Sequence, residues 1–262
     1  MSPDERWTGW LEIAPRPALP ALPISTLEGG PPTLEGQVVL ITGGSSGLGR
    51  SLIELCLVEG AHVSTLSRRP VAGVAPDHAL RFAQTIGDVT RPEDRARWIG
   101  DTLANWGRID ALINNAAIVD GDPGVGGGIV DLHRLFEVNA VAPDELIRLV
   151  AAPMRARGRG RIINITSELS MTAPPAHLAG YAATKVALNQ VTLGWAARLA
   201  PDRILVNALF PGHFRSRLNP TASTTPRIAW PMTRMLLACD SDGPTGRVFS
   251  DRHELHWFGS KR

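Results

Sequence analysis

The only tyrosine of the 262-residue chain, Tyr181, lies four residues before Lys185 in the stretch "YAATK". In a helix, both side chains would project from the same face, one turn apart. A phenol with a pKa near ~10 exchanges protons poorly at neutral pH, and a neighbouring ammonium group would favour the phenolate and lower that pKa. The pair predicts a general acid toward a carbonyl oxygen, or a general base toward an alcohol, although so short a pattern also occurs by chance on exposed helices.

A glycine-rich segment, "TGGSSGLG" at 42–49, follows the β-branched run "QVVLIT" and precedes apolar residues at helical spacing. Gly43, Gly47 and Gly49 allow a tight turn, close approach of a phosphate to the backbone, and close packing of helix on strand. The start of the helix supplies free N–H groups and positive potential for a pyrophosphate. The segment therefore predicts a dinucleotide site.

The second predicted strand is followed by Ser67, Arg68 and Arg69, where a carboxylate would accept hydrogen bonds from an unphosphorylated ribose. Guanidinium groups instead bind a 2′-phosphate through charge-assisted hydrogen bonds. Arg50, directly after the glycine turn, is a candidate second clamp. We expect NADP(H) in preference to NAD(H); the alternative is that these arginines are surface residues in a turn.

Strand-like and helix-like segments alternate from Gly36 onward and must position these residues. The expected strands cover 37–42, 61–67, 80–86, 110–114, 161–166 and 204–210, and the expected helices begin near Leu48 and cover 92–106, about 131–157, and 180–200. Repeated β-α-β order predicts an α/β fold, a doubly wound parallel sheet (Rossmann fold) with helices on both faces. Ligands bind such sheets at the carboxyl ends of the strands.

Further short motifs follow those strands in a fixed order. They are "NNAA" (114–117), "FEVNA" (136–140), "NITS" (164–167), "YAATK" (181–185) and "NALFPG" (207–212). With the TGxxxGxG spacing, the chain over about 36–212 resembles the short-chain dehydrogenase/reductase family, in which the second motif along the chain is commonly NNAG. The tail at 243–249 looks like a closing strand.

The resemblance implies hydride transfer between nicotinamide C4 and a carbonyl or carbinol carbon. It assigns catalytic roles to Asn139, Ser167, Tyr181 and Lys185. Ser167 would position the substrate oxygen, Tyr181 would transfer its proton, and Lys185 would lower the pKa of the phenol and hold the nicotinamide ribose. Asn139 would join Lys185 through water in a proton relay.

The residues expected to bind the cofactor come from the glycine turn, the ends of the strands and the catalytic helix. They are Gly43, Ser45, Ser46, Gly47, Leu48, Gly49, Arg50, Ser67, Arg68, Arg69, Asp88, Val89, Asn115, Ala116, Ala117, Tyr181, Lys185, Pro211, Gly212 and Ser216. By the resemblance, Asp88 would meet the adenine ring, Pro211 and Gly212 would border the nicotinamide, and Ser216 would contact its carboxamide.

Composition excludes several other classes. A net charge of +2 with 20% charged residues gives no field that predicts nucleic-acid binding. Cys56 and Cys239 lack partners at disulfide or metal spacing, which favours a reducing compartment and no metal. No apolar run approaches the ~18 residues of a membrane span, and no signal peptide is recognisable. We expect a soluble, cytoplasmic protein.

The outer parts of the chain are less regular. Residues 1–35 form a proline-rich extension, either a flexible tail or an arm that packs on the domain or a neighbouring subunit, and 36–262 form one domain. The glycine-rich loop at 120–128 should border the pocket, and the segment 213–231 is expected to be a substrate lid. His177 and His213 are candidates to line the pocket, without a catalytic role.

A ketone reductase on a medium-sized hydrophobic substrate is the preferred function, with Leu178 and Phe214 as apolar wall. Alternatives are a redox-neutral enzyme of the same fold, such as an epimerase or dehydratase, and a non-catalytic dinucleotide-binding regulator. The helix beginning at Tyr181 has apolar residues on more than one side (Ala187, Val191 and Trp195). This favours a homodimer or homotetramer.

Overall fold

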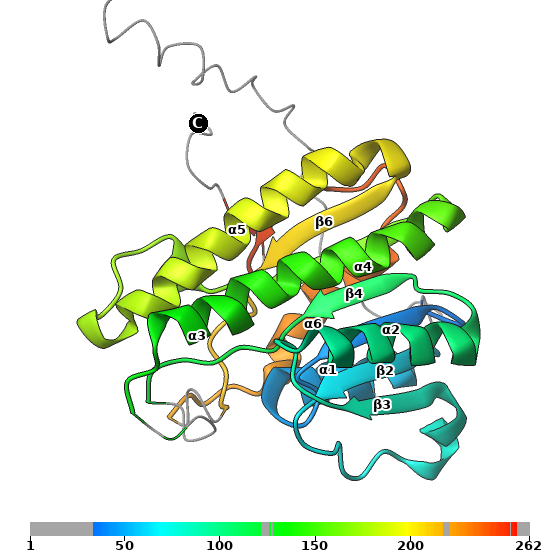
Figure 1. Cartoon of the computed structure of the whole chain (residues 1–262), viewed down its shortest axis with the longest axis horizontal. Coiled ribbons are helices and arrows are strands. Elements are labelled where there is room, and N and C mark those ends of the chain that lie inside the picture. Colours follow the sequence, from blue (N-terminus) through cyan, green and yellow to red (C-terminus); the bar gives the residue numbers. More distant parts are fainter. Residues whose placement is uncertain (1–33, 122–125, 127, 217–220, 252, 256–262) are drawn as a thin grey trace, which may run out of the picture.

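The computed structural model describes residues 34–121, 126, 128–216, 221–251 and 253–255. Its middle layer is an eight-stranded sheet in the order β3-β2-β1-β4-β5-β6-β7-β8 (Figure 1). Neighbouring strands from β3 to β7 are parallel, and β8 is antiparallel to β7. The strands are β1 (Val38–Thr42), β2 (His62–Ser67), β3 (Phe82–Ile86), β4 (Ala111–Asn114), β5 (Gly160–Ile165), β6 (Ile204–Leu209), β7 (Val248–Phe249) and β8 (Glu254–Leu255). The predicted doubly wound sheet is confirmed.

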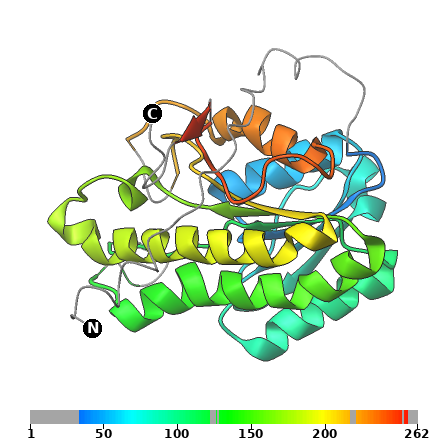
Figure 2. The ribbon, with the colours of Figure 1, turned by 90° about the horizontal axis from the view of Figure 1, so that it is seen from above.

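Helices cover both faces of this sheet (Figure 2). One face carries α2 (Pro92–Trp106), α4 (Ala142–Arg157) and α5 (Ala179–Leu199), and the other carries α1 (Gly47–Val58) and α6 (Trp230–Ala238). A short helix, α3 (Leu132–Phe136), continues through a π-helix (Glu137–Val141) into α4.

Successive apolar residues of a strand pack alternately on the two faces of the sheet. Val38 and Leu40 of β1 belong to the core cluster with α2, α4 and α5, whereas Val39 and Ile41 belong to the cluster with α1 and α6. Because successive strand side chains point to opposite faces, a strand buried on both sides must be apolar throughout. This explains the unbroken apolar run in "QVVLIT".

The expected strands and helices are present, with instructive differences at their ends. The strand expected from residue 80 begins at Phe82, because Pro76–Arg81 form a 3₁₀-helix. The helix expected over 131–157 is divided by the π-helical turn. Strand β7 matches the expected closing strand, whereas α6 and β8 were not foreseen.

The segment 213–231, expected to be a lid, is partly core. Pro226–Ala229 form a 3₁₀-helix that leads directly into α6, and Ala229 is fully buried in the cluster beneath α1. Residues 217–220 lie outside the described part of the chain. Any covering role therefore belongs to the portion before Pro226.

The expected N-terminal extension lies outside the described residues up to position 33. The extension was expected to reach residue 35, but Leu34 is fully buried in the core. Within the described part of the chain, no helix has the length and apolar character that crossing a membrane requires.

The chain runs outward in opposite directions from β1, to β2 and β3 on one side and to β4 onward on the other. The loops after β1 and β4 therefore diverge and leave a crevice at the carboxyl edge of the sheet.

Candidate active site

A cleft lies at this carboxyl edge and gathers most of the residues expected to bind a cofactor. Those that line it are Gly43, Ser45, Ser46, Gly47, Leu48, Ser67, Arg68, Arg69, Asp88, Val89, Asn115, Ala116, Ala117, Tyr181, Lys185, Pro211 and Ser216. Three expected residues, Gly49, Arg50 and Gly212, are not part of its lining. Leu66, Gly87, Ile118, Arg134, Val138, Ile165 and Thr166 line the cleft and were not foreseen, and Phe214 lines it as the expected apolar wall.

Hydrogen bonds from the segment after β4 fix the residues at the start of the glycine turn. The Thr42 hydroxyl accepts hydrogen bonds from the main-chain N–H groups of Asn115 and Ala116, each at 2.9 Å, and Nδ2 of Asn115 donates to the Thr42 carbonyl at 2.8 Å. A Cβ at Gly49 would lie 2.4 Å from the carbonyl oxygen of Gly43, so only glycine fits behind the turn. This leaves backbone at the start of α1 open to the cleft, which fits a pyrophosphate.

Arginine side chains stand at the end of β2. Arg68 and Arg69 are exposed and line the cleft, and the buried Ser67 hydroxyl donates to the Arg69 carbonyl at 2.7 Å, which fixes the turn between them. The Arg50 guanidinium instead pairs with Glu54 at 2.8 Å and donates to the Gly73 carbonyl at 2.9 Å. A carboxylate one helical turn along α1 thus engages Arg50, and the expectation of a second clamp from this residue is not supported.

Arg134 is a cleft residue that the sequence reasoning missed. Its guanidinium donates to Oδ2 of Asp88 and to the Thr90 hydroxyl, each at 2.9 Å. Oδ1 of Asp88 accepts from the main-chain N–H and the hydroxyl of Thr90. Burial alone would raise the pKa of Asp88. The Thr90 hydrogen bonds and the charge of Arg134 outweigh this effect and hold the pKa below its usual value. The residue expected to meet adenine is therefore an ionised and firmly oriented carboxylate.

Of the four residues expected to be catalytic, Tyr181 and Lys185 line the cleft, whereas Ser167 and Asn139 are not part of its lining. Ser167 lies two residues after the end of β5, and its hydroxyl lies beside the phenol of Tyr181 on α5, whose pKa it lowers. Lys185, one turn further along α5, donates from Nζ to the Ile165 carbonyl at 2.8 Å. Its Nζ lies 5.6 Å from the centre of the Tyr181 ring. Two different elements thus bring a hydroxyl, a phenol and an amine together.

Burial controls the ionisation of this group. It raises the pKa of Tyr181 to about 12, against the opposing effect of the Ser167 hydrogen bond. It also lowers the pKa of Lys185 to about 7. The expected lowering of the Tyr181 pKa by Lys185 is therefore not found, because withdrawal from water disfavours the phenolate and the ammonium alike. Ser167 is the group that stabilises the phenolate.

Asn139 is buried in the π-helix and its side chain is engaged on both sides. Oδ1 accepts from the Ile118 N–H at 2.9 Å, and Nδ2 donates to the Ile118 carbonyl at 2.9 Å and to the Thr184 hydroxyl at 3.1 Å. The amide ties the segment after β4 to α5. π-Helical turns are frequent at functional sites because they change how main-chain groups are paired. A relay through Asn139 would therefore use its main chain.

The histidines lie outside the lining of the cleft. His213 is 70% exposed, and its Nε2 lies 2.8 Å from Oε2 of Glu168, the residue after Ser167. His177 is exposed on a single 3₁₀ turn (Ala176–Leu178). Phe214, the residue after His213, lines the cleft, whereas Leu178, the other residue expected to form apolar wall, does not.

Comparisons with known proteins identify relatives over most of the chain. The family model for short chain dehydrogenases matches residues 37–227. Sorbitol dehydrogenase of Cereibacter sphaeroides is 35% identical over 188 residues, which are 68% of this chain and 71% of that protein. The 3-alpha-(or 20-beta)-hydroxysteroid dehydrogenase of Mycobacterium bovis is 32% identical over 181 residues, covering 68% and 69% respectively.

Comparison with solved structures points to the same family. The 3-ketoacyl-(acyl-carrier-protein) reductase of Brucella melitensis, solved in complex with NADH, superposes with a TM-score of 0.73 at 25% identity, over 82% of this chain and 96% of that one. The chain belongs to the short-chain dehydrogenase family, as the motifs predicted. This is a family of oxidoreductases.

Proposed function

We propose that the protein is an NADP(H)-dependent oxidoreductase that reduces a ketone, or oxidises the corresponding secondary alcohol. The observation that carries the proposal is that Tyr181 and Lys185, with Ser167 beside the phenol, lie at one end of a cleft whose other end carries Arg68 and Arg69. One end offers proton transfer and the other a site for phosphate.

Within this proposal, the glycine turn and the start of α1 hold the pyrophosphate, and Asp88 and Val89 hold the adenine. Arg68 and Arg69 bind a 2′-phosphate, and Lys185 and Ser216 hold the nicotinamide end. When bound, the nicotinamide supplies hydride exchange with the substrate carbon. The close packing at Gly43 and Gly49 supports this fit, since a side chain at either position would press on neighbouring atoms of the turn or of the segment after β4 and distort the backbone that faces the pyrophosphate.

Substrate chemistry falls to the side chains around Tyr181. The Ser167 hydroxyl fixes the substrate oxygen beside the phenol, and Tyr181 gives up its proton to that oxygen or accepts one from it. A phenol of high pKa holds its proton at neutral pH, which suits an acid in the direction of reduction. Phe214 and Ile118 give the cleft apolar wall, which supports a substrate of medium size with a hydrophobic body.

Turnover is tested with purified protein, NADPH and a panel of ketones, quinones and keto-esters, by following reduced-nicotinamide absorbance. Turnover that disappears in Tyr181→Phe, with dinucleotide affinity nearly unchanged, is the expected result. Tight NADPH binding without turnover of any ketone would contradict reduction and favour a redox-neutral enzyme or a regulator.

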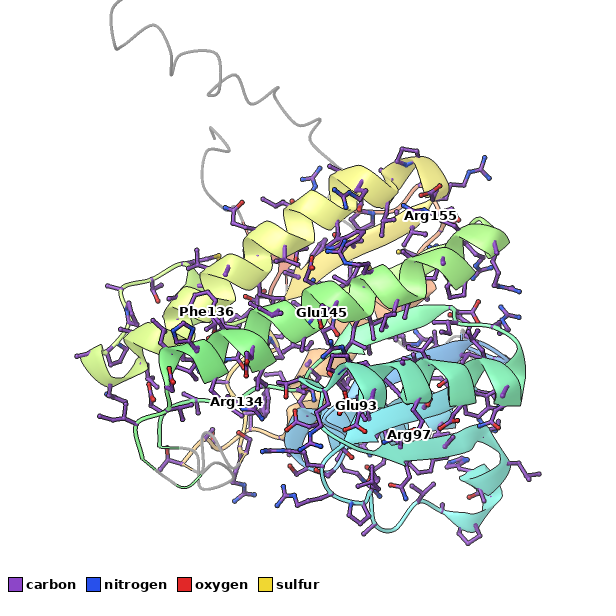
Figure 3. The ribbon with its side chains drawn as sticks, in the orientation of Figure 1. Glu93, Arg97, Arg134, Phe136, Glu145 and Arg155 are labelled. Atoms are coloured by element: carbon purple, nitrogen blue, oxygen red, sulfur yellow. The ribbon has the colours of Figure 1, made fainter. Side chains whose placement is uncertain are left out.

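Cofactor choice is tested with Arg68→Ala. Loss of a charge-assisted contact should weaken NADPH binding by about tenfold or more and leave NADH binding nearly unchanged. Arg155→Ala is the matched control. Arg155 lies near the C-terminal end of α4, where it pairs with Asp202, and it does not line the cleft (Figure 3). Equal losses for both cofactors would show that the preference for NADP(H) is wrong.

Assembly as a homodimer or homotetramer, and a cytoplasmic location, also remain proposals. Trp195, one basis for expecting an interface, is buried within the chain, where its Nε1 donates to Asp144 at 2.6 Å. Exposed apolar residues on the flank of α4, Leu149 at 39% and the preceding Val141 at 47%, support an interface instead. Light scattering of the purified protein tests the assembly. Cys56 and Cys239, the basis for a reducing compartment, are free thiols.

A further inference from the structure

A buried amide lies one helical turn beyond Lys185 on the same face of α5. Asn189 is fully buried, and its Nδ2 donates to the hydroxyl of Ser170 at 2.9 Å. Ser170 is itself buried in the short turn that follows β5. An amide in such a place costs desolvation free energy unless it is paired, so the contact with Ser170 is what makes Asn189 tolerable there.

Ser170 carries this contact to Ser167. Its hydroxyl donates to the Ser167 carbonyl at 2.6 Å, and its main-chain N–H donates to the same oxygen at 3.0 Å. The Ser167 hydroxyl in turn accepts from the Leu169 N–H at 3.2 Å. The main chain of Ser167 is thus held both from α5, through Ser170, and by its own turn.

The pairing of Asn189 is incomplete, which sets it apart from ordinary core packing. Its Oδ1 is buried and has no hydrogen-bond partner among the described residues. A leucine has the same branched arrangement of heavy atoms without polar groups and would avoid that unpaired acceptor. What leucine would lose is the link to Ser170.

We propose that Asn189 is a positioning residue that, through Ser170, fixes the turn carrying Ser167 and so sets the geometry of the Ser167 hydroxyl against Tyr181. The inference rests on the proposed function of those two residues. Asn189 does not reach the reacting atoms. It fixes the position of the Ser167 hydroxyl.

The single tyrosine of the chain gives a direct readout without turnover. With ¹³Cζ-labelled tyrosine, the protein shows one labelled phenol resonance, and Ser167→Ala defines its position when the Ser167 contact is lost. Asn189→Leu and Ser170→Ala should each move the resonance toward the Ser167→Ala position. The double variant should move it no further, because both act on one link.

Thr192→Val is the matched control. Thr192 lies one turn further on α5 and accepts from Asn164 at 2.8 Å, so the substitution removes a buried hydrogen bond of the same helix with no link to Ser167. The resonance should stay at the wild-type position. A shift equal to that of Asn189→Leu would show general loosening of α5 and overturn the inference.

Kinetics supply the second readout. If wild type turns over a ketone, Asn189→Leu should lower kcat/KM by about tenfold, mainly through kcat, with dinucleotide affinity unchanged. A wild-type resonance position in Asn189→Leu, a Ser167→Ala resonance that does not move, or an unchanged kcat/KM would each overturn the proposal. An inactive wild type would instead contradict the proposed function, and the resonance would still decide the positioning role. If Asn189→Leu fails to fold, Ser170→Ala carries the test.

Discussion

Arg134 and Asp88 form an ion pair with an N–O distance of 2.9 Å on the wall of the cleft, although they are 46 residues apart in sequence. The arginine comes from α3 (labelled in Figure 3) and the aspartate from the loop after β3, and both residues line the cleft. Because the guanidinium is partly exposed, the pair contributes more to the orientation of the carboxylate than to stability.

Replacing Arg134 with methionine should therefore weaken the binding of NADPH and NADH alike, by about two- to fivefold, because Asp88 loses a partner that fixes its carboxylate. Fluorescence titration of the reduced dinucleotides measures both affinities. Arg155→Met, at the far end of α4, removes an ion pair of similar exposure with Asp202 and should change neither. A loss confined to NADPH would mean that Arg134 contacts the 2′-phosphate and not the adenine side.

The turn behind the cleft makes a steric prediction. In Gly49→Ala the new Cβ would lie 2.4 Å from the Gly43 carbonyl, which is backbone, and 2.6 Å from Nδ2 of Asn115, which is held by its hydrogen bond to the Thr42 carbonyl. The turn must shift, so dinucleotide affinity should fall by more than about tenfold and the free energy of unfolding by about 1–3 kcal/mol. Urea unfolding and dinucleotide titration measure the two effects.

Gly100→Ala is the control for this substitution. Gly100 lies inside α2 and has open space around its Cβ position, so alanine should stabilise the protein by about 0.5–1 kcal/mol without changing dinucleotide affinity. Unchanged dinucleotide binding in Gly49→Ala would show that the turn can relax and that it does not form the pyrophosphate cradle.

Much of the site could be predicted because strand ends in a parallel sheet meet at one edge. Ser67, Asn115 and Ser167 each lie at or just after the end of a strand-like segment, and repeated β-α-β order alone brings them together. The ion pair between Arg50 and Glu54 could also be predicted from the sequence, since the two residues have i,i+4 spacing in a helix.

The rest depends on information that spacing does not hold. The contact between Arg134 and Asp88 requires the orientation of α3 against the end of β3. The high pKa of Tyr181 depends on how much water the fold excludes, and this burial outweighs the nearby amine that the pattern "YAATK" displays. Position along the chain predicts which groups meet, whereas the sign of a pKa shift follows from their burial.

Lys185 offers a test of that burial. Its side chain is 2% exposed, and the pKa of about 7 lies well below the value of 10.5 that an exposed lysine has. Between these two pH values the unfolded chain holds a proton that the folded chain has released. The free energy of unfolding must therefore rise with pH in this window, and below about pH 7 the full cost of burying the ammonium applies.

Comparing wild type with Lys185→Met, without added dinucleotide, isolates this contribution because other titrations cancel in the difference. From about pH 7 to about pH 9, the Tm of wild type should rise relative to that of the methionine variant, whereas below about pH 6 the difference should be constant. Tyr181→Phe is the control: the pKa of about 12 lies outside the window, so its Tm difference from wild type should not vary with pH. If the wild-type Tm instead fell relative to Lys185→Met as pH rose, the ammonium would be stabilised in the fold. The original expectation of a permanent cation beside the phenol would then hold.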